Sequence, residues 1–206
     1  MERSAELRNE FGEIDIYLFD QLLRGRFDYR SRILDAGCGS GRNLVYFLRS
    51  GFDVFGIDRD PAAIARVRAL AAQIAPALPP EHFQAGELDS LPWPDEAFDA
   101  LLCSAVLHFA DNEGHFGRML LEMWRVVRPG GLFFARLASV IGLEAPVATD
   151  ANRRARLPDG SVRFVVDEAM LLEWTARLGA ELLDPIKTTN VQNQRCMTTW
   201  VLQKRA

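Results

Sequence analysis

Apolar residues along this chain follow two spacings, one typical of buried strands and the other typical of helices with one apolar face. Short apolar runs predict five strands, over 32–36, 53–58, 82–85, 98–104 and 132–138. Between most of these runs the apolar positions recur every three or four residues and predict helices, over 41–50, 61–74 and 113–127. Strands that alternate with helices in this way predict a mostly parallel sheet with helices on both faces.

The two ends of the chain depart from this alternation. A helix is predicted over Glu10–Arg24, ahead of the first strand. Near the other end, a helix that begins after Asp167 is followed by two strand-like runs, over 182–189 and 194–203. The link between these runs, 190–193, is too short for a parallel crossover, so we expect them to be antiparallel neighbours. The predicted fold class is therefore α/β, a Rossmann-like three-layer sandwich with a mostly parallel seven-stranded sheet and an antiparallel last strand.

Length and composition indicate one domain. The chain has 206 residues, of which 49% are apolar, enough for one sizeable buried core. We expect a single domain over 1–206, with an N-terminal helical flank over 1–30 and an insertion over 141–166. No low-complexity tract or solenoid repeat interrupts this pattern.

Charge and hydropathy narrow the function classes. The net charge of −4 lacks the basic excess that is usual for nucleic-acid binders, so no nucleic-acid partner is expected. The longest apolar stretch, 132–147, is interrupted by Arg136 and Glu144, so no membrane span is expected. The first ten residues mix acids and bases and do not resemble a secretory signal, which predicts a cytoplasmic protein.

Cysteines and histidines give little sign of a metal or redox site. The three cysteines stand at wide spacing without a Cys-x-x-Cys pair, and we interpret them as reduced and structural. The three histidines form no i,i+4 pair and no His-Glu-x-x-His pattern. We therefore predict no metal site.

The strongest motif is the run Ile33–Gly41, in which an apolar strand ends in an acid and a glycine-rich turn opens a helix. Glycines permit tight backbone geometry, and a helix N-terminus offers free amides with a partial positive charge. A nucleotide-like ligand suits such a turn. Dinucleotide-binding enzymes use a similar turn, and a purely structural glycine turn is the other alternative.

A second candidate for ligand binding is Asp58, which ends the second strand 21 residues after Gly37. An acid in this place can accept hydrogen bonds from both hydroxyls of an adenosine ribose, and it also suits NAD. The alternative is a loop acid or a minor helix cap. Because Asp60 already supplies the cap before Pro61, we favour the ligand role.

Taken together, the motifs from Arg32 to Gln203 resemble the class I S-adenosylmethionine-dependent methyltransferases. The glycine turn and the strand that ends at Asp58 resemble the first two motifs of that family. Three further stretches are similar to the motif that holds the adenine, to the fourth-strand region and to the turn before the fifth strand; they are Gly86–Trp93, Ala97–Ala100 with Val106–His108, and Arg128–Gly131. Dehydrogenases do not share this series.

The resemblance implies S-adenosylmethionine as cofactor and assigns contacts to it. Asp35 and the glycine turn would lie near the methionine part, Asp58 at the ribose, and Glu87 with Leu88 at the adenine. The full set of implied cofactor-binding residues is Asp35, Gly37, Cys38, Gly39, Gly41, Asp58, Arg59, Glu87, Leu88 and Ser104. Glu87 departs from the family pattern, in which Asp is more usual.

The function implied is transfer of a methyl group to an unidentified small-molecule acceptor. A base is optional for such a transfer, and His108 is the catalytic candidate, with a packed or exposed structural histidine as the alternative. Acceptor selection is expected in the N-terminal helix, with Phe11, Tyr17 and Phe19, and in the substrate-side insertion 141–166. Four arginines of the insertion either attract an acidic substrate or form a solvated surface, namely Arg153, Arg154, Arg156 and Arg163.

Two other functions stay open at this point. A nicotinamide-dependent oxidoreductase would use the same turn, but Arg42 stands where such enzymes place a third glycine. A non-catalytic module that binds the adenosyl cofactor is the second alternative. No residue pattern indicates an oligomeric state.

Overall fold

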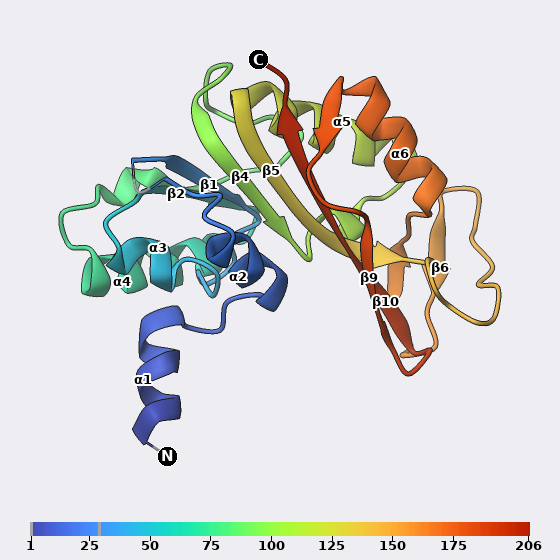
Figure 1. Ribbon diagram of the computed structural model, residues 1–206, viewed down its shortest axis with the longest axis horizontal. Coiled ribbons are helices and arrows are strands. Elements are labelled where there is room, and N and C mark those ends of the chain that lie inside the picture. The colour runs from blue at the N-terminus through green and yellow to red at the C-terminus, as the bar shows by residue number, and fades with distance from the viewer. Residues whose placement is uncertain (1, 29) are drawn as a thin grey trace.

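The computed structural model describes residues 2–28 and 30–206, and within these ranges eight strands form one twisted sheet (Figure 1). The strand order is β3-β2-β1-β4-β5-β10-β8, with β9 paired to β10. The strands are β1 (Arg32–Ala36), β2 (Asp53–Asp58), β3 (Phe83–Ala85), β4 (Phe98–Ser104), β5 (Val127–Ser139), β8 (Ala180–Leu182), β9 (Lys187–Val191) and β10 (Arg195–Lys204). The pairs among β1 to β5 are parallel, whereas β10 is antiparallel to β5, β8 and β9. The predicted fold class is confirmed.

Helices cover both faces of this sheet. The apolar side chains of α2 (Ile16–Leu23), α3 (Val45–Arg49) and α4 (Pro61–Ile74) pack in one buried cluster, and those of α5 (Glu113–Val126) and α6 (Glu168–Arg177) pack in another. Side chains along a strand point alternately to the two clusters. In β5, for example, Phe133 and Leu137 belong to the cluster under α5 and α6, and Phe134 belongs to the cluster on the opposite face. Short apolar runs were therefore the right signal for strands that are buried on both faces.

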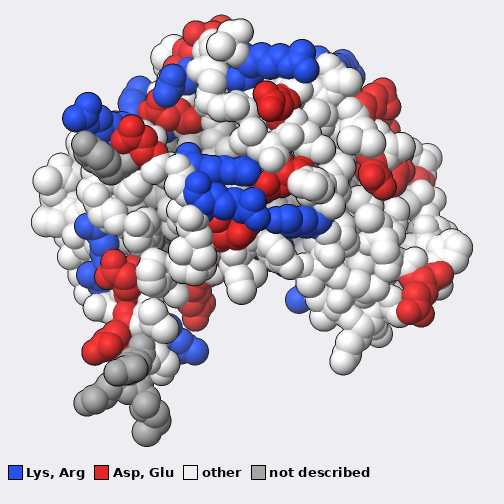
Figure 2. Space-filling view, viewed as in Figure 1, with Lys and Arg blue, Asp and Glu red and all other residues white. Residues whose placement is uncertain are grey.

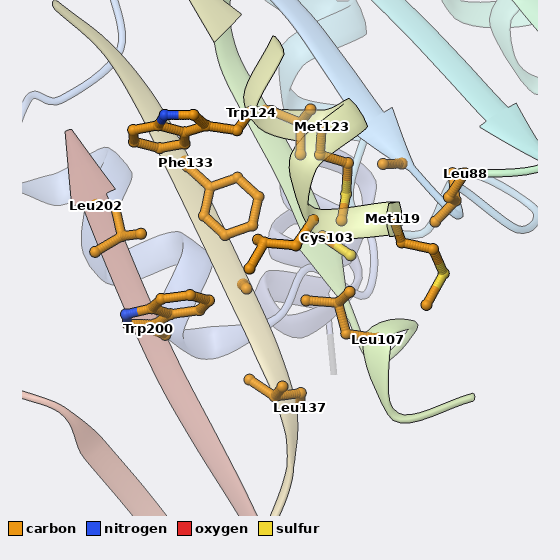
Figure 3. Close-up of a cluster of buried hydrophobic side chains, with 14 of the residues drawn as sticks. Leu88, Cys103, Leu107, Met119, Met123, Trp124, Phe133, Leu137, Trp200 and Leu202 are labelled. Carbon is orange, nitrogen blue, oxygen red and sulfur yellow. The ribbon is translucent and has the colours of Figure 1, made fainter. Parts of the chain in front are cut away.

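Aromatic packing is dense in the cluster under α5 and α6 (Figure 3). The ring of Phe133 lies 6.2 Å from Trp124 and 5.9 Å from Trp200, in edge-on arrangements. The Trp200 Nε1 donates to Thr175 Oγ1 at 3.0 Å, so the polar atom of this buried indole is satisfied. This packing joins β10 to β5 and fixes the C-terminal half of the sheet against the helices.

The C-terminal strands differ from the prediction in number. The run predicted as one strand, 182–189, is divided into β8 and β9, which raises the strand count of the sheet in the described chain from seven to eight. Pro185 lies in the break and has no N–H to donate to a strand ladder. The neighbouring Asp184 is buried and binds Arg26 at 2.8 Å, which draws the chain toward the N-terminal segment.

The N-terminal prediction of one helix over Glu10–Arg24 is wrong. The structure has α1 (Glu2–Phe11) and then α2, separated by a turn in which Gly12 has a φ of +63°. Asp15 caps α2 by accepting a hydrogen bond from the Tyr17 N–H at 3.0 Å. The Asp15 N–H in turn donates to Asn43 Oδ1 at 3.0 Å, so a contact with the turn that leads into α3 fixes the start of α2.

Three further boundaries differ from the sequence analysis. The helix predicted over 41–50 is shorter, because only Val45–Arg49 is α-helical and 41–44 forms the turn that leads into it. The fifth strand begins at Val127, five residues early, because 128–131 bulges from the ladder with β4. The insertion 141–166 contains an unpredicted hairpin of β6 (Arg154–Arg156) and β7 (Val162–Phe164).

The distribution of charged side chains on the surface and the state of the cysteines are typical of a folded domain. On the face shown in Figure 2, basic and acidic side chains lie among one another, and the molecule is hollowed along one edge between α1 and the β9–β10 hairpin. All three cysteines lie in the described part of the chain, buried and without disulfides. Among residues 2–28 and 30–206, no helix is long and apolar enough to cross a membrane, and no group of side chains is arranged to hold a metal ion.

Candidate functional site

A cavity of about 390 Å³ opens where β1, β2, β3 and β4 end. Its polar lining comes from the residues directly after these strands, and its apolar lining comes from the segment after β4 and from the first turns of α5. The lining residues that carry the argument are Gly37, Arg42, Asp58, Glu87, Leu88 and Ser104. Carboxyl ends of parallel strands meet at one edge of a sheet, which is why residues more than 60 positions apart in the chain line one space.

The glycine turn after β1 forms the floor of the cavity. The N–H groups of Gly37 and Cys38 both donate to the Ile57 carbonyl, at 2.8 and 3.0 Å, so the turn is fixed to the neighbouring strand β2. Gly37 has a φ of +82°, and a Cβ built there would lie 2.3 Å from Val106 Cγ2. The turn therefore needs glycine both for its backbone conformation and for its contact with the segment after β4.

Two of the predicted carboxylates share the cavity. Asp58 lines it at the end of β2, accepting hydrogen bonds from the Gly39 N–H at 2.9 Å and the Asp60 N–H at 3.0 Å. Glu87 and Leu88 line it from the segment after β3. The structure thus places Asp58 and Glu87 around one space of a size that suits a small-molecule ligand, whereas Gly39 is not among the lining residues and contacts Asp58 through its N–H.

The remaining predicted cofactor residues divide into two groups. Arg59 and Ser104 line the cavity, whereas Asp35, Cys38 and Gly41 lie beneath or behind its wall. Asp35 is only 2% exposed, and burial, opposed by the Arg42 charge and reinforced by Asp58, raises the pKa of its carboxyl to about 7. A cationic ligand group nearby would favour the ionised form of this carboxyl.

Cys38 and Gly41 serve the packing of the turn. The Cys38 side chain packs against Gly56, and burial raises the pKa of its thiol, so it is not a reactive thiolate. A Cβ at Gly41 would lie 2.8 Å from Val67 Cγ2, which shows how closely the turn approaches α4. Cys38 and Gly41 thus keep the glycine turn in its conformation, and neither residue lines the cavity.

A polar network beside the cavity joins the N-terminal segment to the ends of β4 and β5, and sequence reasoning missed it. The Asp15 carboxylate, 4% exposed, accepts from Ser104 Oγ at 3.2 Å and from Arg136 Nη1 at 2.9 Å. Arg42 donates to Ser104 Oγ at 3.2 Å and lies 3.9 Å from the Asp15 carboxylate. Arg42, which stands where a dinucleotide-binding enzyme has its third glycine, is thus a positively charged residue that lines the cavity.

The segment after β4 and the start of α5 supply the other lining residues that were not predicted. They are Val106, Phe109, His115 and Met119, together with Ala105 at the tip of β4. His115 and Met119 are four residues apart and therefore lie on one face of α5. This spacing would have identified them as lining residues if the start of α5 had been predicted to lie against the segment that follows β3. Ala105 has a φ of +65°, an uncommon conformation for a residue with a Cβ.

His108, the candidate base, does not line the cavity that contains Asp58 and Glu87. It lines a second cavity of about 280 Å³, and Ala105 lines both. Burial, with a smaller contribution from the Arg163 charge, lowers the pKa of His108 to about 4, so the ring is neutral at physiological pH. Its Nδ1 accepts a hydrogen bond from the Ala138 N–H at 3.3 Å.

The residues predicted to select the acceptor have different surroundings. Phe11 packs on Phe19 and Tyr46, and the Tyr17 hydroxyl contacts Thr189 Oγ1 at 2.5 Å, so all three N-terminal aromatics hold the N-terminal segment in place. Of the four arginines of the insertion, only Arg163 lines the second cavity. The others bind Asp167, Asp111 and the Gly160 carbonyl; they are Arg153, Arg154 and Arg156.

The chemistry of the first cavity fits an adenosyl cofactor. The carboxylates of Asp58 and Glu87 can accept hydrogen bonds from hydroxyl and amino groups of a nucleoside, and apolar side chains such as Leu88 and Met119 can cover an aromatic base. The glycine turn leaves room for a ligand against the main chain, since a Cβ at Gly39 would meet nothing within 4 Å.

Comparison with known proteins identifies relatives of this arrangement. Residues 34–135, which contain the end of β1, all of β2 to β4 and most of β5, match a family described as "Methyltransferase domain". The uncharacterized methyltransferase YodH of Bacillus subtilis is 34% identical over 113 residues, covering 55% of this chain and 42% of that protein. A tRNA U34 carboxymethyltransferase of Idiomarina loihiensis is 29% identical over 175 residues, covering 82% of this chain and 52% of that protein.

Solved structures show the same fold. The 1,6-didemethyltoxoflavin-N1-methyltransferase of Burkholderia thailandensis, with bound 1,6-didemethyltoxoflavin and S-adenosylhomocysteine, superposes with a TM-score of 0.70 at 20% identity, covering 100% of this chain and 84% of that one. At this identity the likeness concerns the fold. The chain spans about half the length of the first curated relatives it matches.

Proposed function

This chain belongs to the class I S-adenosylmethionine-dependent methyltransferase family, and we propose that it transfers the methyl group of that cofactor to a small-molecule acceptor. The observation that carries the proposal is the shared cavity: the glycine turn, Asp58 and Glu87 line one space at the carboxyl ends of the parallel strands. In the proposed site, Asp58 holds the ribose, Glu87 and Leu88 hold the adenine, and Asp35 with the Gly37 turn supports the methionine part.

When bound, S-adenosylmethionine would supply a methyl group on a sulfonium, which the lone pair of an acceptor could take while the thioether and any proton of the nucleophile leave. The chain's own contribution is to bind, orient and exclude water. Asp58 and Glu87 fix the nucleoside, while Val106 and Phe109 give the first cavity an apolar cover. No residue has to change its charge for this contribution.

A small-molecule acceptor is supported by the size of the second cavity and by a net charge of −4. The name of the Idiomarina relative indicates that it acts on tRNA, and that of the Burkholderia neighbour indicates a small heterocycle. An acceptor test therefore includes both a low-molecular-weight metabolite extract and total tRNA. Label that enters tRNA and not the extract would contradict the small-molecule proposal.

The cofactor is tested by calorimetry with S-adenosylmethionine, S-adenosylhomocysteine and NAD. We expect binding of the two adenosyl compounds and none of NAD, because Arg42 occupies the place of the third glycine of a dinucleotide turn. Binding of NAD alone would contradict the family function. Turnover of methyl-labelled cofactor with the extract then separates an enzyme from a non-catalytic cofactor-binding module.

A further inference from the structure

The second cavity contains three arginines from three separate parts of the chain. Arg136 comes from β5, Arg163 from β7 and Arg195 from the start of β10, and all three line the same space of about 280 Å³. The cavity adjoins the first one at Ala105, at the tip of β4. A group bound among these arginines would lie beside the proposed cofactor site.

Each of these guanidinium groups is held in place by other residues. Arg136 binds Asp15 at 2.9 Å and lies 5.2 Å from the centre of the Tyr17 ring. Arg163 donates to the Val162 carbonyl at 2.9 Å and lies 4.9 Å from the centre of the Phe109 ring. Because these contacts fix the side chains before any ligand arrives, little conformational entropy is lost when an anion binds.

The charges around the cavity do not cancel. Asp159 lines it and lies 3.7 Å from Arg195, and hydrogen bonds from Ser161 above all keep the pKa of Asp159 below its usual range. Asp15 balances a second arginine, Arg136. Within the described ranges of the chain, no carboxylate forms an ion pair with Arg163. Arg136 and Arg195 thus each have a carboxylate partner, and Arg163 is the guanidinium of this cavity that stays available to a ligand.

His108 adds a hydrogen-bond donor to this set. Its Nδ1 accepts from the Ala138 N–H, so the proton of the neutral ring is on Nε2. A ring nitrogen that already carries a proton can donate to an anion but cannot accept a proton from a nucleophile. This arrangement favours a binding role for His108 over the base role predicted from the sequence.

We propose that Arg136, Arg163, Arg195 and His108 form an acceptor subsite for a carboxylate, so the methyl acceptor is a small monoanion. This proposal rests on the proposed function of the adjoining cavity. It commits to a carboxylate because Arg163 is the one arginine of this cavity without a carboxylate partner in the described part of the chain, and because a guanidinium binds a planar carboxylate through two parallel hydrogen bonds. A phosphate dianion would find only this one unpaired guanidinium.

The first test fractionates a low-molecular-weight metabolite extract by ion exchange into anionic, neutral and cationic pools and assays each with methyl-labelled cofactor. We expect label in the anionic pool, with the acceptor eluting as a monoanion. Label only in the neutral or cationic pool would overturn the anionic subsite and leave the methyltransferase function standing. Label in no pool, despite cofactor binding, would contradict the methyltransferase function and with it the subsite.

The second test compares Arg163→Gln with Arg156→Gln in the full chain, using the active anionic pool as acceptor. Both substitutions remove one charge from the β6–β7 hairpin, but Arg156 does not line the second cavity. We expect Arg163→Gln to raise the apparent KM about tenfold with kcat changed less than about threefold, and Arg156→Gln to change neither. Equal effects of the two variants would overturn the proposal.

A direct binding measurement keeps the proposal testable if activity is low. Arginine Nε–H resonances of the ¹⁵N-labelled protein, saturated with S-adenosylhomocysteine, are followed during titration with benzoate and with benzamide as probes. We expect benzoate, and not benzamide, to shift the resonances that disappear in Arg163→Gln and Arg195→Gln. Shifts that are the same for both probes, or that are absent for both, would contradict a carboxylate subsite.

Discussion

The two cavities at the carboxyl ends of the strands differ in how the chain assembles them. The first takes its polar lining from short segments that directly follow β1, β2, β3 and β4, and these strands are neighbours in the sheet. The second takes its arginines from within β5, from the hairpin of the insertion, and from the antiparallel strand β10. The first is a product of local motifs, whereas the second depends on long-range packing.

This difference explains why the sequence motifs point to a cofactor but not to a particular acceptor. Residues that follow parallel strands meet at one sheet edge in any fold of this type, so a motif implies a place. The arginines of the second cavity share no motif, and their meeting depends on the β6–β7 and β9–β10 hairpins. On the proposed subsite, acceptor specificity would belong to a part of the molecule that can vary without disturbing the glycine turn.

The largest effect is expected from Asp58→Asn, which should weaken ligand binding in the first cavity without changing the second cavity. The substitution removes the charge at the proposed ribose contact, and we expect S-adenosylhomocysteine affinity to fall about 100-fold or more, about 3 kcal/mol. Calorimetry measures this loss, and circular dichroism checks the fold.

The matched control for that prediction is Asp53→Asn, the same substitution at the opposite end of β2. Asp53 is half-exposed and pairs with Arg32 at 3.2 Å, away from the cavity. We expect unchanged cofactor affinity there. Equal affinity of the folded Asp58→Asn protein and the wild type would remove the ribose assignment.

A smaller loss is expected from Gly37→Ala, which tests the contact between the turn and the segment after β4. The new Cβ would meet the Val106 side chain in a backbone conformation that alanine disfavours, and we expect the free energy of unfolding to fall by about 2 kcal/mol. Denaturant unfolding measures it.

Two comparisons sharpen the Gly37 result. Gly25→Ala has a similar positive φ but no atom within 4 Å of the new Cβ, so only the backbone strain, about 1 kcal/mol, is expected there. Adding Val106→Ala to Gly37→Ala should recover part of the loss, because it removes the clash. A loss at Gly37 no greater than that at Gly25 would show that the contact with Val106 is unimportant.

A pH-dependent effect is expected from Asp35, beneath the first cavity. Its carboxyl has a pKa of about 7 in the folded chain against an ordinary value of 3.8, so the unfolded state loses this proton first as the pH rises. Between about pH 4 and pH 7 this group therefore lowers the free energy of unfolding, by at most about 1.4 kcal/mol per pH unit. Below pH 4 the penalty is absent, and above pH 7 it is complete.

The variant Asp35→Asn isolates that contribution, because an amide does not titrate. The difference in unfolding free energy between the variant and the wild type should grow in favour of the variant from pH 4 to pH 7 and then stay constant. A difference that does not change with pH would show that the pKa of Asp35 is the same in the folded and unfolded states.

The smallest effect is expected from Asp60→Ala, two residues beyond the ribose contact. Asp60 caps α4 by accepting from the Ala62 N–H at 2.9 Å, and loss of such a cap costs about 1 kcal/mol of stability. Cofactor affinity should change less than about twofold, since the side chain points to the helix. A loss of affinity as large as that of Asp58→Asn would make the two acids indistinguishable as ligand contacts.

Sequence reasoning predicted the central sheet well because its signals are local. The apolar runs identify strands that are buried on both faces, and Asp60 and Asp167 cap helices where predicted, each accepting an N–H from the first turn. The predicted antiparallel pairing of the last two strands is confirmed by β9 and β10. These features depend on residues a few positions apart.

The same reasoning failed where distant parts of the chain compete with a local pattern. The spacing of Ile14, Leu18 and Leu22 is helical, yet Asp15 binds Asn43, Ser104 and Arg136, and these bonds end the helical run on its N-terminal side. The run 182–189 has strand character, yet Pro185 and the buried Asp184 divide it. In both cases a buried polar group has its partners far away in the sequence.

The sequence by itself determined the fold class, the glycine turn and the position of Asp58 and Glu87 at one sheet edge, because strand direction alone brings the ends of parallel strands together. Only the tertiary structure decided that Arg42 lines the first cavity beside the buried Asp15, that His108 faces a different space, and that three arginines meet there. Their meeting depends on hairpin packing and on buried charge pairing, which act between residues that no local pattern links.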